Sequence, residues 1–231
     1  MIEALEAKFR AELQKGQILV CTFGLQDSKR DQVETTLDDI VATATFPRIV
    51  SGDHRMAVKK CAMACNLIED DEEGMYSGEW FEENVASQME SVKAPDGRTT
   101  YKFVSDSARR YFRNNYAKTV KILYRADPSH KHMLVSALKF SGGCVAVVGE
   151  SISDATSIVE ADVGMVMGQS GCQISIKTAN IIFTNDDISS LHTSCRWGRN
   201  IYDSIKKFLQ FQMTVNVAVC LTVLLGAVSL G

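Results

Sequence analysis

The chain has 231 residues, which is enough for one large domain or for a domain with an appendage. Its hydrophobic content of 45% and charged content of 23% are ordinary for a protein with a buried core. The net charge of −3 and the lack of an arginine-rich aromatic patch give no reason to expect nucleic acid as a partner.

The N-terminal segment, residues 1–17, is charged and has a helical pattern, so it is expected to be a helix and not a secretory signal. This predicts that the chain starts in the cytosol. The seven cysteines lie in apolar or helical contexts, and no second pair accompanies Cys61 and Cys65 to complete a zinc site. Buried, reduced thiols are the favoured interpretation.

The first elements alternate between strand and helix. Residues 18–24 form a continuous apolar run, which predicts a buried strand. Apolar residues at helical spacing then predict a helix over 33–41. A second strand is expected over 44–50, followed by Ser51-Gly52-Asp53, and a second amphipathic helix over 58–65.

A polar insertion is expected at 69–118. Its acidic start, 69–73, is interpreted as a solvated loop in preference to a calcium site. Alternation then resumes with a strand over 120–124 and a helix that has Pro128 in its first turn. Three further strands are predicted, interleaved with short helices, at 145–149, 163–167 and 180–184. This order predicts an α/β fold with a parallel sheet and right-handed crossovers, spanning residues 18–187.

The last segment, residues 188–231, reads as one long helix. Its first part is amphipathic and basic, and no charged residue occurs from 208 to 230. About 20 apolar residues suffice for a helix to span a bilayer, and the preceding basic residues suit a cytosolic end. A buried core helix is the alternative, but the chain has no helices of matching apolarity to surround it. We therefore expect an integral membrane protein with most of the chain on the cytosolic side.

Candidate site residues follow the predicted strands, where open parallel sheets bind ligands. Each of them alone is more often a helix cap than a ligand. Together, however, they place a hydroxyl, a lysine and paired acids on successive strand ends, a set suited to phosphoryl groups and magnesium. The candidates are Asp27, Arg30, Ser51, Asp53, Arg125, Lys131, Glu150 and Asp154.

Several motifs together resemble the P-type ATPases, which have a haloacid-dehalogenase-like fold, and especially the calcium-transporting, plasma-membrane type. The matching segments are G-L-Q-D-S-K-R at 24–30, I-V-S-G-D at 49–53, R-A-D-P-S-H-K at 125–131, V-A-V-V-G-E-S-I-S-D at 145–154, A-D-V-G-M-V-M-G at 161–168 and W-G-R-N-I-Y-D-S-I onward from 197. The resemblance runs from about residue 18 to the C-terminus and is weakest over 69–118. It implies the later part of a phosphorylation domain followed by a transmembrane helix.

The resemblance also implies roles for the candidates. Lys131 and Ser51 would hold phosphoryl oxygens, while Glu150 and Asp154 would lie beside Mg²⁺. The residues implied to lie near ATP are Asp27, Arg30, Asp53 and Arg125. Asn216 would fall at a calcium-coordinating position, although a hydrogen bond between helices is an equal alternative for it.

Two departures from the family pattern stand out. The D-K-T-G-T motif, whose aspartate receives the phosphate, is missing, and the nearest string, at 39–43, lies in a predicted helix without the lysine. Glu150 replaces an aspartate and is one methylene longer, which would displace its carboxylate by about 1 Å. In the resembled sheet the aspartate strand lies between the Ser51 and Glu150 strands. Its loss would leave two exposed edges that favour recruitment of another chain.

Three functions are weighed. The first is a fragment or degenerate member of the calcium-transporting pumps, inactive alone, whose missing part comes from a second chain. The second is a non-catalytic, membrane-anchored module that pairs with an intact pump. An independent small phosphatase comes last, because no D-x-D nucleophile follows a strand.

Overall fold

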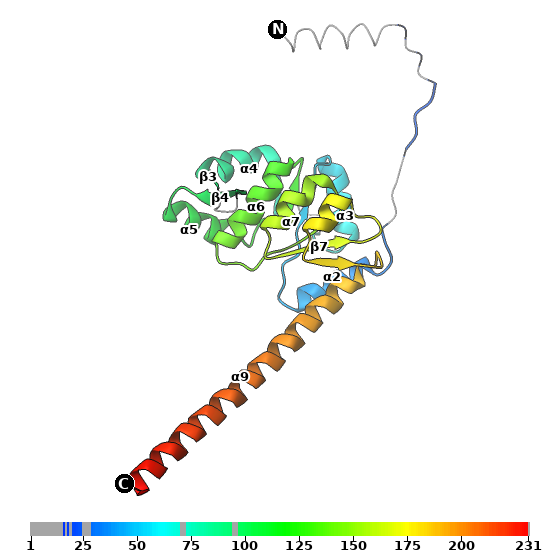
Figure 1. Cartoon of the computed structure of the whole chain (residues 1–231). Helices are drawn as coiled ribbons and strands as arrows, with labels where there is room; N and C mark the ends of the chain where they lie inside the picture. Colours follow the sequence, from blue (N-terminus) through cyan, green and yellow to red (C-terminus); the bar gives the residue numbers. More distant parts are fainter. Residues whose placement is uncertain are drawn as a thin grey trace.

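The computed structural model describes residues 16, 18, 20–24, 29–69, 73–93 and 97–230. They form an α/β body from which one long helix extends, as Figure 1 shows. The expected class, a mixed α/β fold with parallel strands followed by a long C-terminal helix, is confirmed. The expected N-terminal helix over 1–17 lies outside the described residues, apart from Gly16.

The first sheet has three parallel strands in the order β1-β5-β2. Strand β1 (Ile49–Val50) follows helix α2 (Val33–Ala42), and helix α3 (Arg55–Ala64) leads on toward β2 (Met75–Ser77). The central strand β5 (Ile122–Tyr124) is apolar and buried on both faces, which suits a strand flanked by two others.

The second sheet also has three parallel strands, in the order β6-β7-β8. They are β6 (Ala146–Gly149), β7 (Val163–Met167) and β8 (Ile181–Phe183). The 3₁₀ turn η2 (Ile152–Asp154) and helix α7 (Ala155–Glu160) connect β6 to β7, and α8 (Gln173–Thr178) connects β7 to β8. These strands agree closely with the sequence-based prediction.

The polar range 69–118 is largely folded. It supplies β2 to the first sheet and adds helix α4 (Gly78–Asn84), turn η1 (Ala86–Gln88), the antiparallel hairpin β3 (Met89–Lys93) with β4 (Thr99–Phe103), and helix α5 (Asp106–Asn115). Its few apolar residues form the largest core cluster, because Phe81, Val85 and Phe112 pack against Leu123 and Leu134. A polar composition therefore concealed one strand of the sheet and much of the core.

Helix α6 (Pro128–Phe140) joins these parts, since it packs against β4 and α5 on one side and against α7 on the other. Pro128 occupies the first turn, as expected from its fixed φ angle. The side chain of His130 accepts a hydrogen bond from the Asp127 amide at 3.2 Å, which fixes the start of the helix.

The expected strand over 18–24 does not form among the described residues of that range. Residues 18 and 20–24 belong to no strand or helix and are exposed. The side chain of Val20 is 88% exposed and that of Phe23 is 80% exposed. A strand needs a hydrogen-bonding neighbour, and neither sheet pairs with this apolar segment.

Helix α9 (Ser189–Leu230) has 42 residues and therefore a length of about 63 Å. Near its start it packs against α2, where Arg199 donates to the Thr43 carbonyl at 2.9 Å and His192 lies 3.6 Å from the Asp39 carboxylate. Beyond this contact its side chains are exposed (Figure 1). Within the described residues it is the one helix long and apolar enough to cross a membrane.

Candidate functional site

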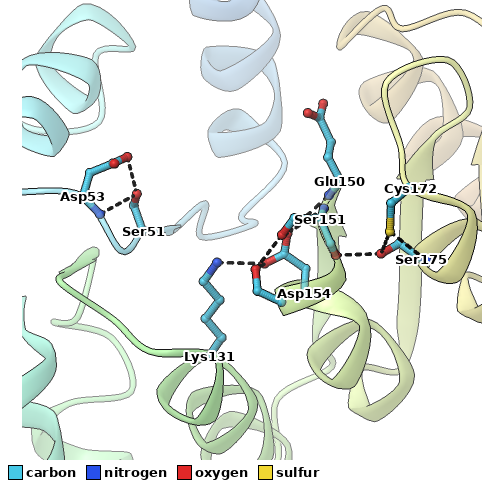
Figure 2. Close-up of polar contacts among 9 residues, drawn as sticks. Ser51, Asp53, Lys131, Glu150, Ser151, Asp154, Cys172 and Ser175 are labelled. Carbon is cyan, nitrogen blue, oxygen red and sulfur yellow. Dashed lines mark hydrogen bonds and ion pairs between the residues drawn. The ribbon is translucent and has the colours of Figure 1, made fainter. Parts of the chain in front are cut away.

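The candidate site lies at the carboxyl ends of the strands of both sheets. Ser51 follows β1, Arg125 follows β5, and Glu150 follows β6. Lys131 reaches the same region from the first turns of α6, and Asp154 reaches it from η2 (Figure 2). The strands run parallel within each sheet, and the contact between Lys131 and Asp154 brings the groups that follow β5 and β6 together.

The centre of the site is an ion pair between Lys131 and Asp154. The ammonium group of Lys131 donates to Oδ1 of Asp154 at 2.8 Å, and both side chains are less than one fifth exposed. Oδ2 of Asp154 accepts from the backbone amide of Ser151 at 3.1 Å and from its hydroxyl at 2.8 Å. This geometry fixes a cation at the strand ends.

Burial by itself raises the pKa of Asp154. Hydrogen bonds from Lys131 and Ser151 lower the pKa by more than burial raises it, so the pKa of Asp154 lies below its usual value. The carboxylate is therefore charged at neutral pH and keeps Lys131 in position. It also has few remaining lone pairs for another ligand, because both oxygens already accept hydrogen bonds.

This shift predicts a pH dependence of stability. A carboxylate whose pKa is lower in the folded state stabilises the fold above its unfolded pKa of about 3.9, and this contribution is lost as the pH falls through the folded value. We expect the free energy of unfolding of the wild-type chain to fall more steeply below about pH 4 than that of Asp154→Asn. Urea denaturation of both proteins in detergent between pH 2.5 and 7 measures this. Parallel curves would contradict it.

Ser51 and Asp53 form a second pair in the loop after β1. The Ser51 hydroxyl donates to Oδ2 of Asp53 at 2.7 Å, and the Asp53 amide donates back to the Ser51 hydroxyl at 3.2 Å. The Ala126 amide donates to the Ser51 carbonyl and the Arg125 amide to the Asp53 carbonyl, so this loop is tied to the end of β5. Figure 2 shows Ser51 facing the same space as Lys131.

Glu150 and Asp154 do not form the expected pair of carboxylates. The Glu150 side chain points away from Lys131 and Asp154 in Figure 2, and its Oε1 accepts from Arg30 at 3.2 Å. Arg30 also donates to the Asp186 carbonyl. The extra methylene of glutamate lets the carboxylate reach this arginine. Asp154 is paired with Lys131 and Glu150 with Arg30, so the two carboxylates as arranged do not share a magnesium ion.

The side chains of the other sequence candidates take no part in the Lys131–Asp154 ion pair. Arg125 is exposed and has a positive φ of 48° at the end of β5. Asp27 lies outside the described residues. Asn216 lies far along α9, where its side-chain oxygen accepts from Gln212 at 3.4 Å.

Two contributors to the site were missed by the sequence reasoning. A Cβ on Gly149 would lie 2.6 Å from Cβ of Asp154, so only glycine lets η2 fold back against β6. Cys172 lies beside the same turn, because its thiol contacts the Ser175 hydroxyl at 3.1 Å and that hydroxyl donates to the Ser151 carbonyl at 2.7 Å. Hydrogen bonding with the Ser175 side chain, and the hydrogen bond that the Ser175 amide donates to the sulfur, lower the pKa of Cys172.

The cysteines are all free thiols, but the expectation that they are buried is wrong for most of them. Cys65 is buried, Cys172 and Cys195 are partly buried, and the other four are exposed. An apolar neighbourhood in the sequence did not imply burial, since part of that apolar surface belongs to 18–24 and to α9, which the body does not cover.

A cavity of about 150 Å³ adjoins the ion pair, between the two sheets. Strand β1 is the edge of the first sheet and β6 is the edge of the second. The cavity is lined by residues 145–148 of the β6 segment, by Arg48 and Val50 of the β1 segment, and by apolar residues of α6, with Lys131 and Asp154 at one end. We call this cavity the inter-sheet slot.

Comparison with curated sequences finds calcium-transporting ATPases. No protein-family model matches the sequence. The chain is 31% identical over 218 residues to calcium-transporting ATPase 9, plasma membrane-type, of Arabidopsis thaliana, covering 93% of the chain and 18% of that protein. It is 32% identical to the plasma membrane calcium-transporting ATPase mca-1 of Caenorhabditis elegans, covering 92% of the chain and 16% of that protein.

A yeast relative and a solved structure complete the comparison. Calcium-transporting ATPase 2 of Saccharomyces cerevisiae is 33% identical over 222 residues, covering 96% of the chain and 17% of that protein. The catalytic domain of the CPx-ATPase CopB-B has a TM-score of 0.48 and 20% identity, covering 74% of the chain and 47% of the compared one. The chain thus spans less than one fifth of the length of these three relatives.

Proposed function

We propose, from the premise that the chain belongs by sequence with the calcium-transporting P-type ATPases, that it is one part of an ATP-driven calcium pump. The chain covers less than one fifth of these relatives. It would supply the residues that hold the phosphoryl group and one membrane helix. It would do so together with a segment that brings the phosphorylated aspartate. That segment comes either from a longer form of the same protein or from a second chain. The chain as given is proposed to be inactive alone.

The observation that carries the proposal is the Lys131–Asp154 pair at the mouth of the inter-sheet slot. A lysine fixed in this way stabilises the negative charge that spreads over a transferring phosphoryl group. Asp154 holds the ammonium group in position through the ion pair, and the lowered pKa of Asp154 keeps its carboxylate ionised at neutral pH. The Ser51 hydroxyl, now donating to Asp53, could turn its proton to a phosphoryl oxygen.

The slot supports a strand as the missing partner. Backbone groups of β1 and β6 face it, and an inserted parallel strand would join the two sheets into one of seven strands. All six existing strands end at the same edge, so the residue after such a strand would emerge beside Lys131. An aspartate there would be positioned to accept a phosphoryl group.

The remaining assignments extend the same proposal. ATP would lie near Arg30, Asp53 and Arg125, with Asp27 as a further candidate. Because the carboxylates do not fit Mg²⁺ as arranged, no step in this chain alone is assigned to the metal, which ATP would bring to the assembled site. Helix α9 would cross the membrane with the α/β body on the cytosolic side, and Asn216 would supply one of the six to eight oxygens that Ca²⁺ requires.

Phosphate trapping tests the proposal. We expect no acid-stable acyl-phosphate when the purified chain alone is incubated with radiolabelled ATP and Mg²⁺. Co-expression with a pump segment that carries D-K-T-G-T and the other membrane helices is expected to yield one that hydroxylamine removes. An acid-stable adduct on the chain alone would contradict the assignment of the acceptor to another segment, and no adduct in the complemented pair would contradict the proposal itself.

A non-catalytic, membrane-anchored module is the second candidate. It is favoured by one observation, the turning of Glu150 toward Arg30 and away from the Lys131 ion pair. This module would pair with an intact pump and leave its chemistry to that partner. Co-purification with a full-length pump, without any acyl-phosphate in the complemented pair, would favour this candidate over the first.

A further inference from the structure

The apolar residues 20–24 are exposed, and the edge strands β1 and β6 each have one side without a strand partner among the described residues. Residues 20–24, V-C-T-F-G, are extended and unpaired, with Val20 and Phe23 almost fully in water. Their sequence is that of a buried strand. Exposed Val and Phe side chains forgo the free energy that burial of their apolar surface would provide. The segment therefore gains from any apolar site within its reach.

The inter-sheet slot offers backbone partners for such a segment. The amides of Ile49 and Ser51 donate to β5, so the alternation of a parallel ladder turns the amide and carbonyl of Val50 into the slot. The carbonyl of Val145 accepts from the amide of Val163 of β7. The backbone groups of Ala146 and Val148 therefore point away from β7 and into the slot. A strand placed here would hydrogen bond on both sides.

The slot also contains an unsatisfied polar group. Ser157 lines it and is almost completely buried, and its hydroxyl has no hydrogen-bond partner among the described residues. A buried hydroxyl without a hydrogen-bond partner is destabilising, because it has lost its hydrogen bonds to water. The apolar lining from α6, which includes Leu134, Val135 and Leu138, matches the side chains of Val20 and Phe23. The slot thus has a hydroxyl without a hydrogen-bond partner among the described residues and an apolar lining that an inserted segment would cover.

The number of residues between the segment and Arg30 limits how far the segment can lie from the slot. Arg30 lies six residues after Gly24 and is bonded to Glu150, at the carboxyl end of β6, and to the Asp186 carbonyl. Six extended residues reach about 20 Å. This tether also fixes direction, because a strand that ends at Gly24 and leads to Arg30 runs parallel to β1 and β6.

The order of elements agrees with that direction. Residues 20–24 are followed by α2 and then by β1, which is the strand–helix–strand sequence of a parallel crossover. Consecutive strands in such units usually lie side by side, and the free side of β1 is the inter-sheet slot. Topology therefore assigns this segment to the slot.

We propose that the chain has a second state, in which residues 20–24 leave the solvent-exposed position of this structure and insert between β1 and β6 as a parallel strand. The inserted strand would cover Val148 and provide partners for Val50 and Ala146. It ends in Gly24, which has no carboxylate, so the self-filled state holds no phosphate acceptor beside Lys131. This inference rests on the proposed function only in taking the slot as a strand site, and it makes the segment a competitor of the aspartate strand.

Cysteine cross-linking tests the insertion directly. Native Cys21 is kept, the other six cysteines are changed to serine, and a new cysteine is introduced as Val148→Cys on β6 or, as control, Ile182→Cys on β8. These two positions are on opposite edges of the same sheet and are equally exposed, 44% and 46%. We expect the disulfide with position 148 to form at least about tenfold faster under mild oxidation. Equal rates would overturn the proposal.

Two further measurements keep the test decisive. A peptide of sequence I-L-V-S-T-F-G, added in excess, should slow the cross-link to position 148. In the wild-type chain, hydrogen exchange should show protected amides at Val50 and Val148, and Phe23→Asp should speed exchange there by about tenfold. Unchanged exchange in Phe23→Asp would overturn the insertion even if the serine replacements unfold the chain. None of these readouts involves phosphate, so they fail independently of the proposed pump function.

Discussion

Replacing Lys131 by methionine is expected to lower acyl-phosphate formation in the complemented pair by about 100- to 1,000-fold. The ammonium group is held by the Asp154 carboxylate beside the slot, and both residues line the slot. Methionine keeps much of the side-chain volume and removes the charge, so the phosphoryl group loses its stabilising partner. The rate of labelling by radiolabelled ATP, measured under quench conditions, gives the effect.

Lys177→Met is the matched control, because Lys177 is an exposed lysine on α8 outside the slot lining, and its labelling rate should stay within about twofold of wild type. Lys131→Arg keeps the charge and should recover part of the rate. If Lys131→Met labels as fast as wild type while its melting temperature is unchanged, the assigned role of Lys131 is wrong.

Replacing Phe81 by alanine is expected to destabilise the chain by about 3–5 kcal/mol, a large part of the 5–15 kcal/mol typical of a domain. Phe81 has no exposed surface and packs in the cluster that contains Leu123 of β5 and Leu134 of α6. Its ring also contacts His130, which caps the helix that carries Lys131. Urea denaturation in detergent, followed by circular dichroism, measures the loss.

Phe46→Ala is the matched control, since Phe46 is 62% exposed and should change stability by less than about 0.5 kcal/mol. A change below about 1 kcal/mol for Phe81→Ala would mean that the cluster around Phe81 does not form the core of this body.

Most of the parallel elements could be predicted from the sequence because their signals are local. Buried parallel strands are continuous apolar runs, and those at 145–149 and 163–167 were found nearly residue for residue. Pro128 marked the start of α6, and the charge-free stretch from 208 marked the apolar part of α9. Strand direction also predicts that Ser51, Lys131 and Asp154 lie at one edge, and in the structure Lys131 and Asp154 are in contact.

The structure of the polar range 69–118 was harder to predict from the sequence, because its strand and core residues depend on packing against distant parts of the chain. Strand β2 is only three residues long, and it became a strand by pairing with β5. Phe81 and Phe112 lie in short helices rich in charged residues, and they are core residues only because α6 and β5 pack against them. Composition alone predicted an insertion there.

The sequence by itself determined the alternation of strands and helices, the long C-terminal helix, the set of candidate residues and the lack of D-K-T-G-T. Only the tertiary structure decided that Asp154 pairs with Lys131 while Glu150 turns to Arg30, and that 20–24 lie outside both sheets. The reason is physical: periodicity is encoded between neighbours in the chain, whereas an ion pair or a strand edge depends on which distant groups come within hydrogen-bonding distance.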